Sequence, residues 1–154
     1  MIRKIISGGQ TGADRAALNF AIKQNIPHGG WVPKGRIAED GRIPDIYQLL
    51  EMPTDSYPER TEQNVIHSDS TVIISHSVPT GGSAYTAEMA KKHGRPWLHL
   101  DMEKTTVDEA AKRLRGWITD NSISVLNVTG PRESNNLDIY QATTKLLQTT
   151  FPSA

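Results

Sequence analysis

The sequence predicts a three-layer α/β/α Rossmann-like sandwich with a mainly parallel central sheet. Three observations favour this class: short apolar segments alternate with segments of helical spacing, the apolar segments lack the period of two typical of half-exposed strands, and glycine-rich turns follow several of them. Units of this kind are expected to have right-handed crossovers. The chain of 154 residues has no repeat, low-complexity tract or linker, so residues 1–154 are predicted to form a single Rossmann-like domain.

The N-terminal part begins with a short apolar segment, residues 2–6, which is typical of a buried strand. A helix is predicted from residue 13 to about 24, because four apolar residues fall on one face, and it ends before Pro27. Residues 27–47 are rich in glycine, proline and charge, which indicates a long irregular segment. A short strand is expected within residues 47–52.

The rest of the chain continues the alternation. Helices are predicted over 58–67, 84–91, 107–118 and 139–147, and strands over 71–75, 96–100 and 124–128. Pro58 suits a first helical turn, where the missing N–H costs nothing. Thr106 and Glu109 have the spacing of a capping box, in which each side chain binds the backbone of the other residue.

Composition excludes several classes of function. The 17 basic and 17 acidic residues balance, so no net charge attracts nucleic acid or an anionic membrane. There is no cysteine, which excludes disulfide scaffolds, thiolate metal sites and cysteine nucleophiles, and no metal site is predicted. No apolar run has the length of a membrane span or a signal peptide. We therefore expect a cytoplasmic protein without nucleic-acid or membrane partners.

Three glycine-rich loops each follow a predicted strand and precede a predicted helix: Gly8–Gly12, Thr80–Ser83 and Gly130–Ser134. The carboxyl ends of parallel strands lie at one edge of the sheet, so the loops should converge there. Glycines allow a close backbone approach, and helix N-termini attract anions. A phosphate-bearing ligand is predicted to bind there, through Gly8, Gly9, Gln10, Thr11, Gly12, Gly81, Gly82, Ser83, Gly130, Arg132 and Ser134. The alternative is that the loops are tight structural turns.

Known nucleotide motifs match poorly. The dinucleotide fingerprint would lack its first glycine, and no glycine loop is followed by the Gly-Lys-Ser/Thr of a P-loop. The nucleophile elbow of hydrolases is also absent. A nicotinamide dehydrogenase and a P-loop nucleoside triphosphatase are therefore not expected.

Other polar residues have two interpretations each. Asp14 either complements a helix dipole or orients a ligand hydroxyl. Arg60 and Asn64 lie one helical turn apart and form either a solvated face or a polar face toward the site. Trp31 either covers a ligand ring or fills the core, and Lys34 and Arg36 either close over the ligand or lie on a mixed-charge surface.

Together these segments resemble one family over nearly the whole chain, the molybdenum cofactor carriers. The matching blocks are 8–14, 30–36, 38–41, 57–61, 64–65, 81–83 and 126–134. The resemblance implies a Rossmann-like fold similar to that of the cytokinin-activating phosphoribohydrolases. It also implies a homo-oligomer, dimer or tetramer, that holds the molybdenum cofactor, a pterin with a terminal phosphate, and passes it to molybdoenzymes.

The phosphoribohydrolases carry a Pro-Gly-Gly-x-Gly-Thr-x-x-Glu loop, which residues 79–88 match only in part. Gly81, Gly82 and Glu88 are retained, whereas the later glycine is lost and the threonine is displaced. An N-glycosidic hydrolase of nucleoside 5′-monophosphates is therefore the alternative function, with Glu88, Asp14 and Arg60 as candidate catalytic residues. A nucleotide-sensing module without activity is a third possibility, and for each residue a structural role is the alternative.

Overall fold

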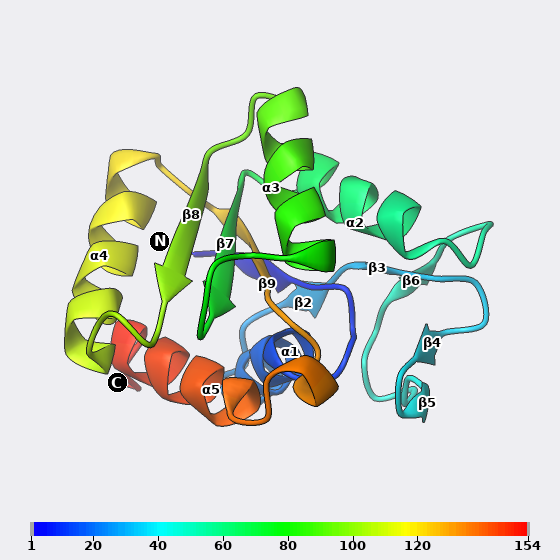
Figure 1. Cartoon of the computed structure of the whole chain (residues 1–154), viewed down its shortest axis with the longest axis horizontal. Helices are drawn as coiled ribbons and strands as arrows, with labels where there is room; N and C mark the ends of the chain where they lie inside the picture. Colours follow the sequence, from blue (N-terminus) through cyan, green and yellow to red (C-terminus); the bar gives the residue numbers. More distant parts are fainter. Residues whose placement is uncertain (1, 154) are drawn as a thin grey trace.

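The computed structural model describes residues 2–153, and its centre is a parallel sheet of five strands (Figure 1). The strand order is β2-β1-β9-β7-β8. In that order the strands span His28–Gly29, Lys4–Ile6, Val125–Thr129, Ser70–Ser75 and Trp97–Asp101. Every neighbouring pair is parallel, so the carboxyl ends of all these strands lie at one edge. The predicted α/β class with a parallel central sheet is confirmed.

Helices cover both faces of this sheet. They are α1 (Ala13–Lys23), α2 (Tyr57–Ile66), α3 (Gly81–Lys92), α4 (Val107–Asp120) and α5 (Ile139–Thr150), with a 3₁₀ turn η1 at Glu133–Asn135. Helix α5 packs between α1 and α4 on one side, and α2 packs on α3 on the other (Figure 1). No helix among residues 2–153 is long and apolar enough to cross a lipid bilayer.

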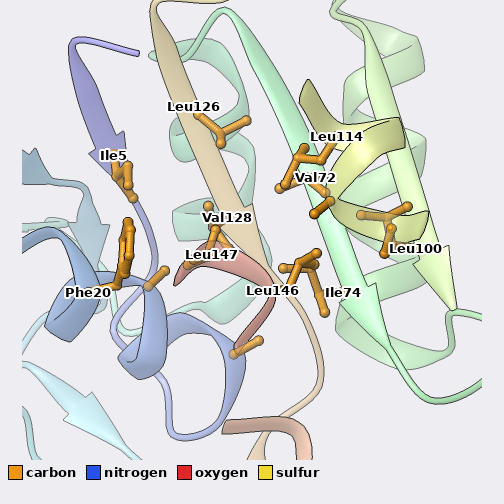
Figure 2. Close-up of a cluster of buried hydrophobic side chains, with 14 of the residues drawn as sticks. Ile5, Phe20, Val72, Ile74, Leu100, Leu114, Leu126, Val128, Leu146 and Leu147 are labelled. Carbon is orange, nitrogen blue, oxygen red and sulfur yellow. The ribbon is translucent and has the colours of Figure 1, made fainter. Parts of the chain in front are cut away.

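The main hydrophobic core lies between the sheet and the α1–α5–α4 layer. Figure 2 shows Val72 and Ile74 of β7 beside Leu126 and Val128 of β9, with Leu146 of α5 packed over them. All of these side chains are fully buried. Strand β7 is buried at every position, as expected for a strand covered on both faces. This packing holds the carboxyl ends of β1, β9 and β7 side by side.

The predicted elements are all present, and three helices are longer than expected. Helix α3 begins at Gly81 and not near residue 84, α4 continues to Asp120, and α5 continues to Thr150. The capping box is half formed, because the Thr106 hydroxyl accepts from the Glu109 N–H at 3.2 Å while the Glu109 carboxylate accepts from Thr105 instead.

The segment predicted to be irregular, residues 27–47, contains short strands. Besides β2 it forms β3 (Trp31–Val32), β4 (Ile37–Ala38) and β5 (Gly41–Arg42), and β3 pairs in parallel with β6 (Leu50–Glu51). The Asn64 side chain binds both backbone groups of Trp31, at 2.7 and 3.1 Å. Strands β2 and β3 therefore depend on partners distant in sequence, which explains why local composition did not indicate them, whereas β4 and β5 pair with each other in a short hairpin.

Candidate functional site

A cavity of about 540 Å³ lies at the carboxyl edge of β1, β9 and β7. These three strands are neighbours in the sheet, and each of the three glycine-rich loops follows one of them. The structure brings residues of all three loops to the cavity, as their pattern predicted. The lining comprises Gln10, Asp14, Tyr57, Pro58, Arg60, Thr61, Ser77, Thr80, Gly81, Gly82, Ser83, Tyr85, Thr86, Thr129, Gly130, Pro131, Arg132, Asn135 and Asn136.

One part of the lining consists of three buried polar side chains, Gln10, Asp14 and Arg60. Their exposed fractions are 6%, 5% and 8%. Gln10 belongs to the first loop, Asp14 to the first turn of α1 and Arg60 to α2. The Arg60 Nη1 donates to the carbonyl of Gly8 at 2.5 Å, which fastens α2 to the first loop. We call these three residues the polar base of the cavity.

Asp14 is the most perturbed titratable group of this base. Burial raises the pKa of its carboxyl from 3.8 to about 6, against the opposing effect of the Arg60 guanidinium and of the Gln10 N–H. Burial also lowers the pKa of Arg60, and the nearby Asp14 carboxyl opposes that change. A carboxyl that titrates near neutrality in a cavity is typical of functional sites.

The N-terminus of α3 forms another part of the lining, with Gly81, Gly82 and Ser83 in its first turn. Gly81 has a φ of +51°, a conformation that glycine adopts without strain. The N-cap residue Thr80 makes no side-chain capping bond, so the helix end is not neutralised by a local side chain. Unpaired N–H groups and the positive end of a helix dipole generally favour anions at such a position.

Two tyrosines and a second arginine complete the polar and aromatic lining. The guanidinium carbons of Arg60 and Arg132 lie 5.3 and 5.6 Å from the centre of the Tyr57 ring. Tyr85 of α3 lines the cavity as well. Cations held against an aromatic face keep their charge and their remaining donors. The cavity therefore offers two fixed positive charges and two aromatic rings to a ligand.

Glu39, which precedes β5, fastens two of the glycine-rich loops together. Its carboxylate accepts from the hydroxyl of Thr11. It also accepts from the N–H of Ser134 at 3.2 Å and from the hydroxyl of Ser134 at 2.5 Å. These hydroxyls lower the pKa of Glu39. An ion pair of the same hairpin joins Asp40 to Arg15 of α1 at 3.0 Å.

Five of the predicted phosphate-binding residues do not line this cavity. The Thr11 and Ser134 hydroxyls bind Glu39, as described above. Gly9 packs against apolar side chains of β3 and its surroundings, and Gly12 packs against the backbone of Pro131. Gly8 faces the Arg60 guanidinium, in a small hollow next to the cavity. The first loop thus contributes chiefly Gln10, because its other residues are used in packing.

The residues predicted to cover a ligand ring lie elsewhere in the fold. Arg36 is buried and donates to three backbone carbonyls, those of Ile43, Pro44 and Tyr47. The Trp31 ring lies against the His67 ring at 5.7 Å between centres. Lys34 is exposed, and so is Glu88, a candidate catalytic residue on α3 that is absent from the lining.

Tyr57 and Tyr85 were not predicted as site residues, although both line the cavity. Asn136 was missed too, and it binds the His76 ring at 2.6 Å, which joins the loops that follow β7 and β9. Arg60 and Asn64 were interpreted as a solvated face or as a face toward the site; both are buried, and Arg60 lines the cavity. The proline at the start of α2 was a usable signal, because it fixes where the helix begins and which face Tyr57 and Arg60 share.

Within residues 2–153, no group of three or more His, Asp or Glu side chains is placed to hold a metal ion.

Comparisons with known proteins agree over nearly the full length. The circularly permutated YpsA SLOG family matches residues 5–151. A crystal structure from Syntrophus aciditrophicus SB, named "Putative molybdenum carrier protein", is 55% identical and superimposes with a TM-score of 0.97, covering 97% of this chain and 95% of that chain. No curated protein matches the sequence.

Proposed function

The chain belongs to the circularly permutated YpsA SLOG family, and from that premise we propose that it binds and carries a small phosphate-bearing planar ligand. The molybdenum cofactor is the cargo we propose, with molybdoenzymes as recipients and a homo-oligomer as the functional form. The name of the 55% identical structure supports a molybdenum carrier role.

One observation supports this proposal above the others: the uncapped N-terminus of α3 and the Arg132 guanidinium line the same cavity. Backbone N–H groups together with an arginine are the groups that proteins use most often to hold a phosphate. The amides of Glu133 and Ser134, by contrast, already bind Thr11 and Glu39. The phosphate of the ligand is therefore assigned to α3 and Arg132.

The dimensions and the lining suit a pterin of this kind. A volume of about 540 Å³ falls in the range of small-ligand sites, roughly 300–1,000 Å³. Tyr85 offers an aromatic surface to the ring, Tyr57 holds the two arginines, and Ser83 offers a buried hydroxyl. In this arrangement the protein holds the pterin and its phosphate, and the metal travels with the cargo.

Binding of the isolated molybdenum cofactor by wild-type protein and by Arg132→Ala tests the proposal. If Arg132 pairs with a buried phosphate, its removal is expected to weaken binding by about 1.5–3 kcal/mol. Arg113→Ala is the matched control, because Arg113 is an exposed residue of α4 outside the cavity lining. Equal dissociation constants for all three proteins, or no binding by any of them, would refute a phosphate-held cargo.

Asp14 favours a second candidate function, hydrolysis of the N-glycosidic bond of a nucleoside 5′-monophosphate. Its carboxyl lines the cavity with a pKa near 6, which suits a group that stabilises charge at the sugar or activates water. Water would replace the base at the anomeric carbon, and the base would leave with a proton. Release of free base from AMP, abolished by Asp14→Asn and retained by Glu88→Gln, would establish this activity.

A further inference from the structure

The three residues of the polar base share a feature that the phosphate site does not explain. Gln10 Nε2, Asp14 Oδ1 and Arg60 Nε have no hydrogen-bond partner among residues 2–153. Each of these side chains is more than nine-tenths buried and lines the same cavity. Buried polar atoms are normally paired, so three unpaired atoms in one cavity indicate a group that they are arranged to bind.

The hydrogen bonds around Gln10 determine which way its amide points. Its Oε1 accepts from the N–H of Thr11 at 3.1 Å and from the N–H of Glu39 at 2.8 Å. Both bonds require an oxygen at that position, so the side-chain NH₂ is the free end and acts only as a donor.

Asp14 offers the opposite polarity. Its Oδ2 accepts from the N–H of Gln10 at 3.3 Å, and Oδ1 has no hydrogen-bond partner among residues 2–153, although the side chains of Thr129 and Ser7 are near enough to lower the pKa of the carboxyl. Arg60 adds a further free donor at Nε, because the bond to Gly8 uses Nη1. The polar base therefore presents one acceptor together with donors from two neighbouring side chains.

We propose that this base recognises a cyclic amide edge of the ligand's ring, with Asp14 accepting from the ring N–H and Gln10 donating to the ring carbonyl oxygen. The proposal rests on the function proposed above and specifies which part of the planar ligand contacts the polar base. A pterin and a guanine both have such an edge, with an amino group beside the N–H.

A phosphate does not satisfy the same three atoms. Near neutral pH it is mostly a dianion, which has no donor, and the carboxylate of Asp14 would repel it. A ring edge with one donor and one acceptor matches both polarities at once. The ring edge therefore lies at the polar base, while the phosphate lies toward α3 and Arg132, and the two ends of the ligand are recognised separately.

The test uses guanosine 5′-monophosphate, which combines the amide edge with a phosphate, and its N1-methyl derivative, in which the ring N–H is blocked. Titration calorimetry of the unaltered protein is expected to show binding that N1-methylation weakens about tenfold or more. Because this comparison needs no substitution, it does not depend on whether any variant folds.

Gln10→Glu supplies a second measurement. The substitution keeps the oxygen that accepts from Thr11 and Glu39 and changes only the free NH₂ into an oxygen, so it should weaken binding of guanosine 5′-monophosphate about tenfold or more. Gln141→Glu, an exposed change of the same kind on α5, should leave the dissociation constant unaltered.

Two further measurements separate this inference from the proposed function: binding of guanosine, which lacks the phosphate, and binding by Arg132→Ala. If guanosine 5′-monophosphate and its N1-methyl derivative bind equally, or neither binds, the amide-edge inference is overturned. In that case a loss of cofactor binding in Arg132→Ala would still support the phosphate-held cargo. If guanosine binds as tightly as its monophosphate while N1-methylation weakens both, the amide edge is supported and the phosphate site is contradicted.

Discussion

The guanidinium of Arg60 contacts Gly8 directly, with Nη1 donating to the Gly8 carbonyl at 2.5 Å. A side chain on Gly8 would occupy the position of that guanidinium, because a Cβ built there overlaps Arg60. Gly8 is needed for the space it leaves, since its φ lies outside the left-handed region. Gly8 therefore allows Arg60, a buried arginine of α2, to reach the cavity.

Gly8→Ala is expected to destabilise the protein and weaken ligand binding, because Arg60 must move from its buried position. Overpacking of this kind typically costs about 1–3 kcal/mol in the free energy of unfolding. Chemical denaturation measures the loss. Gly116→Ala is the control, since nothing lies within 4 Å of a Cβ there and the residue is inside α4. That variant should gain about 0.5–1 kcal/mol; equal stability of the two variants would contradict the role of Gly8.

Asp14 should make stability depend on pH. Its pKa is about 6 in the folded protein and 3.8 as an ordinary Asp, so the folded state holds the proton more tightly. The stabilisation is complete below pH 3.8 and is lost as pH rises through 6. A difference of about two pH units, at 1.36 kcal/mol per unit, amounts to about 3 kcal/mol.

Asp14→Asn should therefore gain stability relative to wild type between pH 4 and pH 8, by up to that amount. Denaturant titrations at both pH values measure the difference. Asp40→Asn is the contrast: Arg15 lowers the pKa of Asp40, so that carboxylate stabilises the protein at any pH above 3.8, and the difference between this variant and wild type should change little between pH 4 and pH 8. If the difference in the free energy of unfolding between wild type and Asp14→Asn is the same at both pH values, Asp14 does not titrate in this range.

The Glu39 contacts predict coupling between the hairpin and the loop that follows β9. In a double-mutant cycle, Glu39→Ala and Ser134→Ala should show a coupling energy of about 0.5–1 kcal/mol, since both groups are exposed. The lowered pKa of Glu39 means that this contribution is present above its ordinary pKa of 4.5 and lost as pH falls below it. Hydrogen exchange of the η1 amides should accelerate in Glu39→Ala. Strictly additive single effects would rule out the contact.

Thr106→Ala should remove the N-cap of α4, where the hydroxyl accepts from the Glu109 N–H at 3.2 Å. The expected loss is about 1 kcal/mol of stability. Thr105→Ala serves as the control because the Thr105 hydroxyl is outside the cap and makes only exposed contacts. Thermal unfolding followed by circular dichroism distinguishes the two, and an equal effect of both changes would contradict the capping role.

The sequence predicted the main elements because their causes are local. Strand β7 is a run of β-branched and apolar residues, and α4 has an unbroken apolar face that begins after Thr106. The convergence of the glycine-rich loops also followed from local pattern, because a parallel sheet places all carboxyl ends at one edge. Strand β6 lies within residues 47–52, where a short strand was expected, whereas β2 to β5 were not predicted. The pairing of β2 and β3 depends on partners distant in sequence, and Asn64 holds the backbone of Trp31.

The candidate site was predicted in outline only. Gln10, Arg132 and the start of α3 line the cavity, whereas Arg36 and Trp31 have structural contacts. A buried arginine and an exposed one have the same local sequence pattern, so burial could not be inferred from spacing. Glu39 was interpreted as part of a ligand-closing loop or of a mixed-charge surface. Its contacts with Thr11 and Ser134 were not predicted, because these partners are far from it in sequence.

Strand β9 lies between β1 and β7, although it is the last strand of the chain. The pairs β1–β2 and β7–β8 have no direct connection in the sheet and are joined only when residues 125–129 insert between them. During synthesis the ribosome therefore releases residues 1–124 before the two pairs can be joined through β9. We expect the sheet to close, and the ligand cavity to be completed, only when that late segment and the loop that follows it have emerged.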